Sequence, residues 1–171
     1  MAVDPEARPH DEVAEAELPA NWELVRAIAL RKLTTRARTR HELDLALQAK
    51  NVPPSVKDAV LDRMQEVGLV DDASFAVSWV ASRQQRGHLS RRILRRELQA
   101  KGVERGDIDR ALDNVSLDAE LASARDLVER KHAAMGALAR DVQYRRLAGL
   151  LGRRGFDTAV ITRVLADVLG E

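Results

Sequence analysis

Arginine side chains at helical spacing carry the clearest chemistry in this chain. Arg91, Arg92, Arg95 and Arg96 fall on one side of a predicted helix, over about 140° of its circumference, and the leucines of that helix fall on the other side. A planar guanidinium group binds phosphate or carboxylate through two parallel hydrogen bonds. Because like charges at this spacing repel each other, the pattern predicts either an anionic partner or distant acidic residues that offset a solvated basic face.

Basic residues gather in three stretches at a nearly regular interval, and we interpret them as candidate contacts to a partner or to nucleic acid. They are Arg31, Lys32, Arg36, Arg38 and Arg40, then Arg83, Arg86, Arg91, Arg92, Arg95, Arg96 and Lys101, and finally Arg145, Arg146, Arg153 and Arg154. Each contact to a phosphate would give log affinity a slope of roughly −0.7 to −0.9 against log salt. The sequence leaves open whether the target is a phosphate backbone or an acidic groove of a protein.

Residue types for catalysis are absent or poorly spaced. The chain has no cysteine, and its four histidines, His88 among them, lack metal-ligand spacing, so we predict that they are solvated loop residues. Gly149, Gly152 and Gly155 have a G-x-x-G-x-x-G spacing, but they lie within a predicted helix, whereas a phosphate loop needs a strand-to-helix turn. A helix cap explains the pair Asp71–Asp72. We therefore expect no enzyme, no metal and no cofactor.

Charge is unevenly divided along the 171 residues, whose formal net charge is +1. Residues 1–21 carry six acids and one base, a net charge of −5, which leaves +6 for residues 22–171. This leader contains prolines and lacks helical periodicity, so we predict a flexible acidic tail, either a solubilising extension or a shield of the basic body. Neither a signal peptide nor an apolar run of about 20 residues is present, so we expect a cytoplasmic protein.

The helices that position the arginines recur three times. One pattern of leucines and a basic-Gly/Asn turn repeats at offsets of 51 and 53 residues, at Leu43–Val52, Leu94–Val103 and Leu147–Phe156. Each unit contains three predicted helices, and no segment shows the alternation of a strand. Since such units bury little core alone, we predict an all-α protein of three stacked repeats in an elongated, gently curved array. The repeats span 22–70, 71–115 and 116–171.

Capping residues predict where several helices begin and end. Asn21, Ser90, Asp141 and Asp157 have side chains that can accept from free backbone N–H groups at a helix start. Asn51 stands where a left-handed residue would end the middle helix of the first repeat.

Phe75 and Trp79 lie one turn apart on a predicted helix, where two roles are conceivable. They could form a stacking platform for nucleic-acid bases. Aromatic residues at this spacing more often belong to a core, and we predict that role.

The second and third repeats contain two ordered sets of motif residues. They are Gly68–Ala76, Trp79, Arg83, Arg86-Gly87, Leu94, Glu97-Leu98 and Lys101-Gly102-Val103, and then Leu147, Leu151, Arg154-Gly155-Phe156, Val160-Ile161 and Val164-Leu165. These motifs resemble those of the RecX family of recombination regulators, and the similarity covers about residues 22–169. Asn51, where many relatives have glycine, and the acidic leader depart from the family pattern.

The resemblance implies tandem three-helix repeats and a non-enzymatic, monomeric regulator of the RecA recombinase. Such a protein would bind in the groove of the RecA–single-stranded DNA filament, with weak direct contact to the DNA. It would inhibit the ATPase, strand-exchange and coprotease activities of RecA, and so modulate recombinational repair and the SOS response. The alternative is a stand-alone DNA-binding protein. Few Asn or Gln residues accompany the arginines, so such a protein would contact the backbone without reading sequence.

Overall fold

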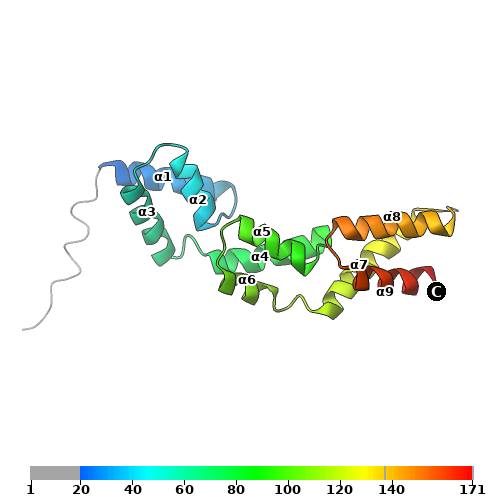
Figure 1. The fold of residues 1–171 in the computed structure, drawn as a ribbon. Coiled ribbons are helices and arrows are strands. Elements are labelled where there is room, and N and C mark those ends of the chain that lie inside the picture. The colour runs from blue at the N-terminus through cyan, green and yellow to red at the C-terminus, as the bar shows by residue number, and fades with distance from the viewer. Residues whose placement is uncertain (1–19, 137, 171) are drawn as a thin grey trace, which may run out of the picture. The chain divides into compact units, whose positions relative to one another are not determined.

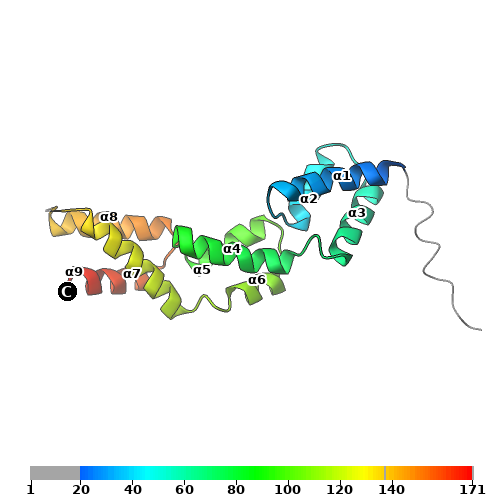
Figure 2. The same cartoon turned by 180° about the vertical axis from the view of Figure 1, so that it is seen from behind.

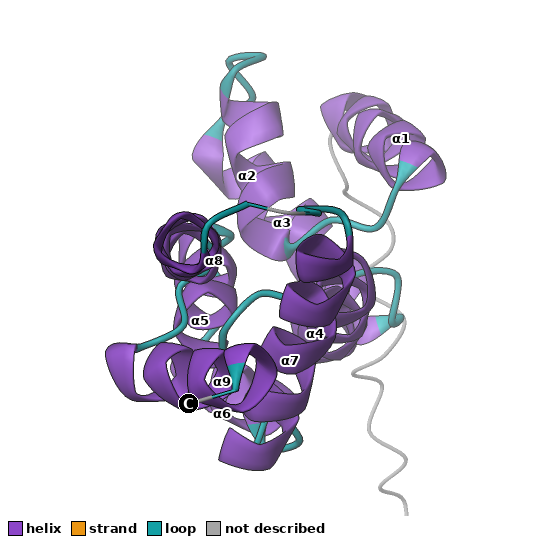
Figure 3. Ribbon diagram, turned by 90° about the vertical axis from the view of Figure 1, so that its right-hand side faces the viewer, coloured by secondary structure: helices purple, strands orange, loops and turns teal. Residues whose placement is uncertain are grey.

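The computed structural model describes residues 20–136 and 138–170, and in these ranges the chain forms helices and loops without a strand (Figure 3). The prediction of an all-α fold is confirmed. The helices are α1 (Ala20–Thr35), α2 (Arg40–Gln48), α3 (Pro54–Glu66), α4 (Asp72–Gly87), α5 (Arg91–Ala100), α6 (Arg105–Leu112), α7 (Leu117–Ala133), α8 (Arg140–Arg153) and α9 (Thr158–Leu169). None of these described helices is long and apolar enough to cross a membrane.

The predicted acidic tail lies almost wholly outside the described residues, which begin at Ala20. α1 already includes Asn21, which therefore lies within the helix and not at its cap as predicted. The proposed curvature of the array stays a prediction.

Two compact units make up the described chain. The first holds residues 20–38 and 42–70, and in it α1 packs against α3. Apolar side chains at helical spacing on the three helices meet in one core, because each helix buries only its apolar stripe. The buried members are Trp22, Val25, Ala29, Leu43, Leu47, Val60, Leu61, Met64 and Val70.

The second unit holds residues 39–41 and 71–170, and it contains two three-helix groups (Figure 1). α4 packs against α6, and α5 also contacts both of these helices. α7 packs along α9, which also contacts α8 (Figure 2). Each group has its own core, formed by Phe75, Ala76, Val80, Leu94, Leu98, Val103, Ile108, Ala111, Leu112 and Val115 in one, and by Ala124, Leu127, Val128, Leu147, Leu151, Phe156, Val160, Val164 and Leu165 in the other.

Capping side chains hold several helix starts in the second unit. The Asp71 carboxylate accepts from the Ser74 N–H at 2.8 Å, and the Asp157 carboxylate accepts from the Val160 N–H at 2.9 Å. Ser90 caps α5 in the same way. The predicted cap at Asp141 is wrong: the N-cap of α8 is Ala139, two residues earlier. Asp141 therefore lies in the first turn of the helix, where its carboxylate interacts favourably with the positive end of the helix dipole.

Phe75 and Trp79 belong to the core, as predicted. Phe75 is buried, and the Trp79 ring stacks on it with centroids 5.6 Å apart. The indole Nε1 of Trp79 donates to the Glu97 carboxylate at 2.8 Å, and the Lys101 ammonium lies 4.2 Å from the indole centroid. Since side chains of this unit occupy the ring's surroundings, the pair offers no open platform for a base.

Candidate partner-binding surface

Two of the four arginines on α5 are held by acceptors on or next to α6. The Arg91 guanidinium donates to the carbonyls of Leu112 and Val115, at 2.8 and 3.1 Å, and so satisfies acceptors at the end of α6. Arg95 forms a charge-assisted bond with Asp109 at 2.7 Å. Intramolecular partners therefore offset part of the like-charge repulsion that the helical pattern predicts.

Arg92 and Arg154 join α5 to the turn that follows α8. Arg92 donates to the carbonyl of Gly155 from two nitrogens, at 3.3 and 3.2 Å. Arg154 donates from its guanidinium to the carbonyl of Gly87 at 2.5 Å, and its own carbonyl accepts from the Ser90 N–H at 3.0 Å. We call this set of contacts the α5–α8 junction.

Gly155 is required at this junction because its neighbours leave no room for a side chain. A Cβ atom there would lie 2.2 Å from Cγ1 of Ile93 and 2.6 Å from the Ser90 hydroxyl. A second contact of the same kind lies elsewhere in the second unit, where the Thr39 hydroxyl donates to the Lys101 carbonyl at 2.7 Å and Gly102 faces His41. The two contacts follow the repeat offset, since 39 corresponds to 90 and 102 to 155.

Basic residues of the first stretch also have intramolecular partners. Arg36 forms two parallel hydrogen bonds with the Glu42 carboxylate, at 3.0 and 3.1 Å, and these bonds raise the pKa of Arg36. Arg38 donates to the Lys32 carbonyl at 3.2 Å. The backbone N–H of Arg40 donates to the Asp72 carboxylate at 2.8 Å, within the second unit.

Arg83 and Lys101 lie against the aromatic pair of the second repeat. The Arg83 guanidinium lies 4.6 Å from the Trp79 ring centroid and donates to Glu97 at 3.1 Å. Lys101 lies over the rings of Phe75 and Trp79. The two cationic side chains pack against the aromatic rings at the edge of the core and so contribute to its packing.

Six of the candidate residues have exposed side chains that form no hydrogen bond or ion pair with any residue in the ranges 20–136 and 138–170. They are Arg31, Arg86, Arg96, Arg145, Arg146 and Arg153. An exposed guanidinium without an internal acceptor keeps all its donors available for a phosphate or carboxylate. These six are therefore the predicted residues whose donors no internal acceptor of the described chain occupies.

The structure brings several of these free arginines towards the α5–α8 junction. Arg154 is bonded to the carbonyl of Gly87. Arg86 directly precedes Gly87 at the end of α4, and Arg153 directly precedes Arg154 at the end of α8, so the bond brings the ends of these two helices, with Arg86 and Arg153, towards each other. Figure 1 shows the end of α8 beside the start of α5. Arg146 is seven residues before Arg153, on the same side of α8 and about 10 Å along its axis. Arg31 lies in the first unit and forms no part of this group.

His88 is not the solvated loop residue that the sequence predicted. It ends α4 in a left-handed conformation with φ of 46°, and its side chain is 12% exposed. Its Nδ1 lies 3.2 Å from the Ser123 hydroxyl, and its Nε2 contacts Arg130 and lies 3.5 Å from Asp126. Within the described part of the chain, no group of three His, Asp or Glu side chains could hold a metal ion.

We expect acidification to destabilise the fold partly through His88. Burial lowers the pKa of His88 from its ordinary value of 6.5, and the nearby charge of Arg130 lowers it further, while Asp126 opposes this and Arg154 adds to it. The unfolded state then takes up a proton near pH 6.5 before the folded state does, so stability falls as the pH drops through that value.

Urea unfolding of the protein and of His88→Asn between pH 7.5 and 5 checks this expectation. Asn tolerates the left-handed conformation, and the variant should lose less stability on acidification. Equal pH slopes for the two proteins would contradict the role of His88.

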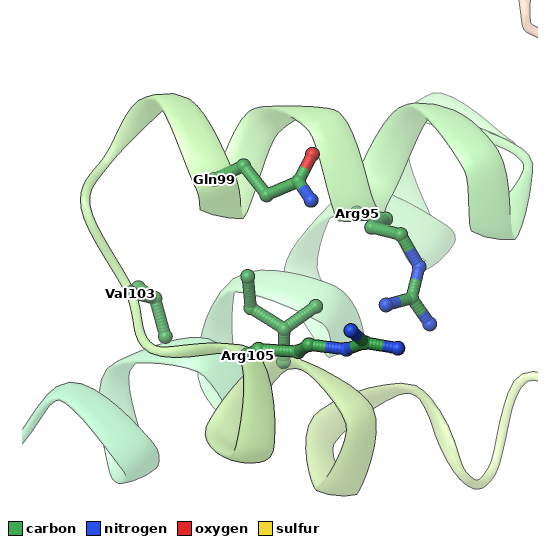
Figure 4. Close-up of a pocket in the computed structure, with 5 residues that line it drawn as sticks. Arg95, Gln99, Val103 and Arg105 are labelled. Atoms are coloured by element: carbon green, nitrogen blue, oxygen red, sulfur yellow. The ribbon is translucent and has the colours of Figure 1, made fainter.

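Sequence reasoning missed a pocket between α5 and α6. Its volume is about 420 Å³, and it is lined by Arg95, Gln99, Val103, Arg105 and Ile108 (Figure 4). Arg105 opens α6 and was not among the predicted residues, because it stands outside the three basic stretches. The guanidinium groups of Arg95 and Arg105 lie on the same side of this pocket.

Three family descriptions match successive parts of the chain. "RecX, first three-helix domain" matches residues 26–64, "RecX, second three-helix domain" matches 71–112, and "RecX, third three-helix domain" matches 118–165. The matches follow the three predicted repeats in order.

Curated relatives and solved structures agree with these matches. "Regulatory protein RecX" of Streptomyces coelicolor is 45% identical over 149 residues, which cover 87% of this chain and 79% of the relative. That of Mycobacterium ulcerans is 44% identical over 155 residues and 90% of each chain. The crystal structure of RecX from Lactobacillus salivarius shares the fold, with a TM-score of 0.76 at 16% identity, over 88% of this chain and 98% of that one.

Proposed function

Because this chain belongs to the RecX family of regulatory proteins, we propose that it regulates the RecA recombinase. It acts without catalysis, as a cytoplasmic monomer that binds in the groove of the RecA–single-stranded DNA filament. Binding inhibits the ATPase, strand-exchange and coprotease activities of RecA, and so modulates recombinational repair and the SOS response. The observation that carries this proposal is the match of all three family domains in sequence order.

Exposed arginines supply the contacts in this proposal. The direct contacts are the six without internal partners, and the arginines of the α5–α8 junction hold two of the three-helix groups together. A filament presents phosphates and carboxylates along a repeating surface, and a chain of basic repeats can contact more than one subunit at a time. Bridging of neighbouring subunits would hinder the intersubunit movement that ATP hydrolysis requires.

The test is the single-stranded-DNA-dependent ATPase of RecA, titrated with this protein well below one molecule per RecA. We expect inhibition at these ratios, because one bound molecule affects several subunits. The variant with Arg96→Glu, Arg146→Glu and Arg153→Glu should need at least about tenfold more protein for the same inhibition. Arg163→Glu is the matched control for each of the three substitutions made singly, since it changes the net charge equally and Arg163 is exposed on α9 and outside the candidate set.

Two outcomes would contradict the proposal. Inhibition that appears only when the DNA is saturated would indicate a stand-alone DNA-binding protein that competes with RecA. Equal loss in Arg163→Glu and in each of Arg96→Glu, Arg146→Glu and Arg153→Glu made singly would show that the free arginines have no special role. Binding to naked DNA, measured over a salt series, separates the two functions.

A further inference from the structure

Two arginines bond across the α5–α8 junction in opposite directions. Arg92 lies on α5, in the group of α4, α5 and α6, and donates from Nε and Nη2 to the Gly155 carbonyl, at 3.3 and 3.2 Å. Arg154 lies in the group of α7, α8 and α9 and donates to the Gly87 carbonyl at 2.5 Å. We call Arg92 and Arg154 the crossed arginine pair. Each three-helix group thus supplies one donor and one acceptor to the other.

Both acceptors of the crossed arginine pair lie near the C-terminal end of a helix. Gly87 is the last residue of α4, and Gly155 follows the C-cap residue of α8. The last carbonyls of a helix lack a partner within it, and the helix dipole is negative at this end. A guanidinium group there satisfies a carbonyl and interacts favourably with the dipole. Each group therefore supplies the cation that stabilises a helix end of the other.

Carboxylates of α7 near the junction are engaged with other groups. Glu120 accepts from the Arg91 N–H at 2.8 Å, and Asp126 pairs with Arg130 at 2.9 Å. The crossed arginine pair bonds instead to backbone carbonyls. Because a backbone carbonyl has no side-chain rotamer, these bonds relate one helix end directly to another.

The positions that correspond to the crossed arginine pair one repeat earlier hold no arginine. By the repeat offsets of 51 and 53 residues, Arg92 corresponds to His41 and Arg154 to Lys101. The Lys101 ammonium lies over the aromatic pair of the second repeat. The crossed arginine pair is thus a feature of the α5–α8 junction and not of the repeat as such.

Arginines without internal partners lie on both sides of the crossed arginine pair. Arg86 and Arg96 belong to the group of α4, α5 and α6, and Arg146 and Arg153 belong to the group of α7, α8 and α9. Arg86 directly precedes one acceptor, and Arg153 directly precedes one donor. A partner that contacts both groups at once binds more tightly when their spacing is set in advance, because less freedom is lost on binding.

We propose that Arg92 and Arg154 are positioning residues, which set the spacing between the free arginines of the two groups and do not themselves contact the partner. This inference rests on the proposed function and deepens it, since it names what the partner recognises: a fixed arrangement of guanidinium groups across two three-helix groups. Removal of either residue leaves all six free arginines in place and lets the two groups move relative to each other.

A distance measurement between two spin labels tests the spacing without RecA. The chain has no cysteine, so Ala81→Cys on α4 and Thr162→Cys on α9 place one exposed label in each group. Double electron–electron resonance on the full-length protein should give one narrow distance distribution. Arg92→Gln and Arg154→Gln, made singly, should broaden it, because each removes bonds across the junction. Neither arginine belongs to an apolar core, so both variants should stay folded.

The RecA ATPase assay, on unlabelled protein without the cysteines, shows whether the spacing matters to the partner. We expect Arg92→Gln and Arg154→Gln to need about fivefold more protein for the same inhibition. Arg163→Gln is the matched control, because it removes the same charge from an exposed site on α9 outside the candidate residues, and it should leave inhibition unchanged. Arg96→Gln should weaken inhibition and keep the distance distribution narrow, as expected of a direct contact.

Three results would overturn the inference. A distribution that stays narrow in both Arg92→Gln and Arg154→Gln would show that the pair does not set the spacing. Broadening with inhibition equal to that of Arg163→Gln would show that the partner does not depend on the spacing. Weaker inhibition with a narrow distribution would show that the pair contacts the partner directly. Absence of inhibition by the wild type would instead contradict the proposed function, and the distances, which need no RecA, keep the two failures apart.

Discussion

Replacement of Gly155 by alanine is expected to lower the free energy of unfolding of the second unit by about 3 kcal/mol. Its backbone has φ of +86°, which strains any residue with a Cβ atom. The added Cβ would also lie 2.2 Å from Cγ1 of Ile93 and 2.6 Å from the Ser90 hydroxyl. Ile93 lies in the first turn of α5 and Ser90 caps it, so the clash pushes α5 away from the turn after α8.

Gly170→Ala separates the backbone strain from the clash. Gly170 has a similar φ of +74°, but a Cβ atom there would meet nothing within 4 Å. Its substitution should therefore cost only about 1 kcal/mol. Urea unfolding of both variants gives the two values. Equal destabilisation by Gly155→Ala and Gly170→Ala would mean that the α5–α8 junction relaxes and contributes little.

Alanine at Arg91 and at Arg96 should have opposite consequences, although the two residues share the basic side of α5. Arg91→Ala leaves the carbonyls of Leu112 and Val115 without their charged donor and should destabilise the protein by about 2 to 3 kcal/mol. Arg96 is exposed and has no hydrogen bond or ion pair in the described part of the chain, so Arg96→Ala should change stability by less than about 0.5 kcal/mol.

Thermal unfolding and RecA ATPase inhibition, measured on the same preparations, test whether Arg91 stabilises the fold while Arg96 contacts the partner. We expect Arg96→Ala to weaken inhibition at unchanged melting temperature. We expect Arg91→Ala to lower the melting temperature and to retain inhibition at a temperature where it stays folded. Inhibition lost only in Arg91→Ala would show that the partner contacts Arg91 and that its internal bonds open on binding.

Much of the fold could be predicted because its signals are local. A helix places its apolar residues at a fixed period, and a cap acts on backbone groups within one turn. Ser90 and Asp157 were therefore correctly identified as caps, and the left-handed position of Asn51, with φ of 56°, was expected. The error at Asp141 is of the same local kind, since a helix start can move by two residues without changing the pattern.

The amino-acid sequence by itself determined three helical repeats, their apolar faces and the set of basic residues. Only the tertiary structure decided which of those basic residues remain available to a partner. The acceptors of Arg91, Arg92 and Arg95 lie 14 to 63 residues away along the chain. His88 likewise meets Ser123 and Arg130, which are 35 and 42 residues distant. Hydrogen bonds and ion pairs depend on distances of a few ångströms, and only the packing of separate helices brings such distant groups that close.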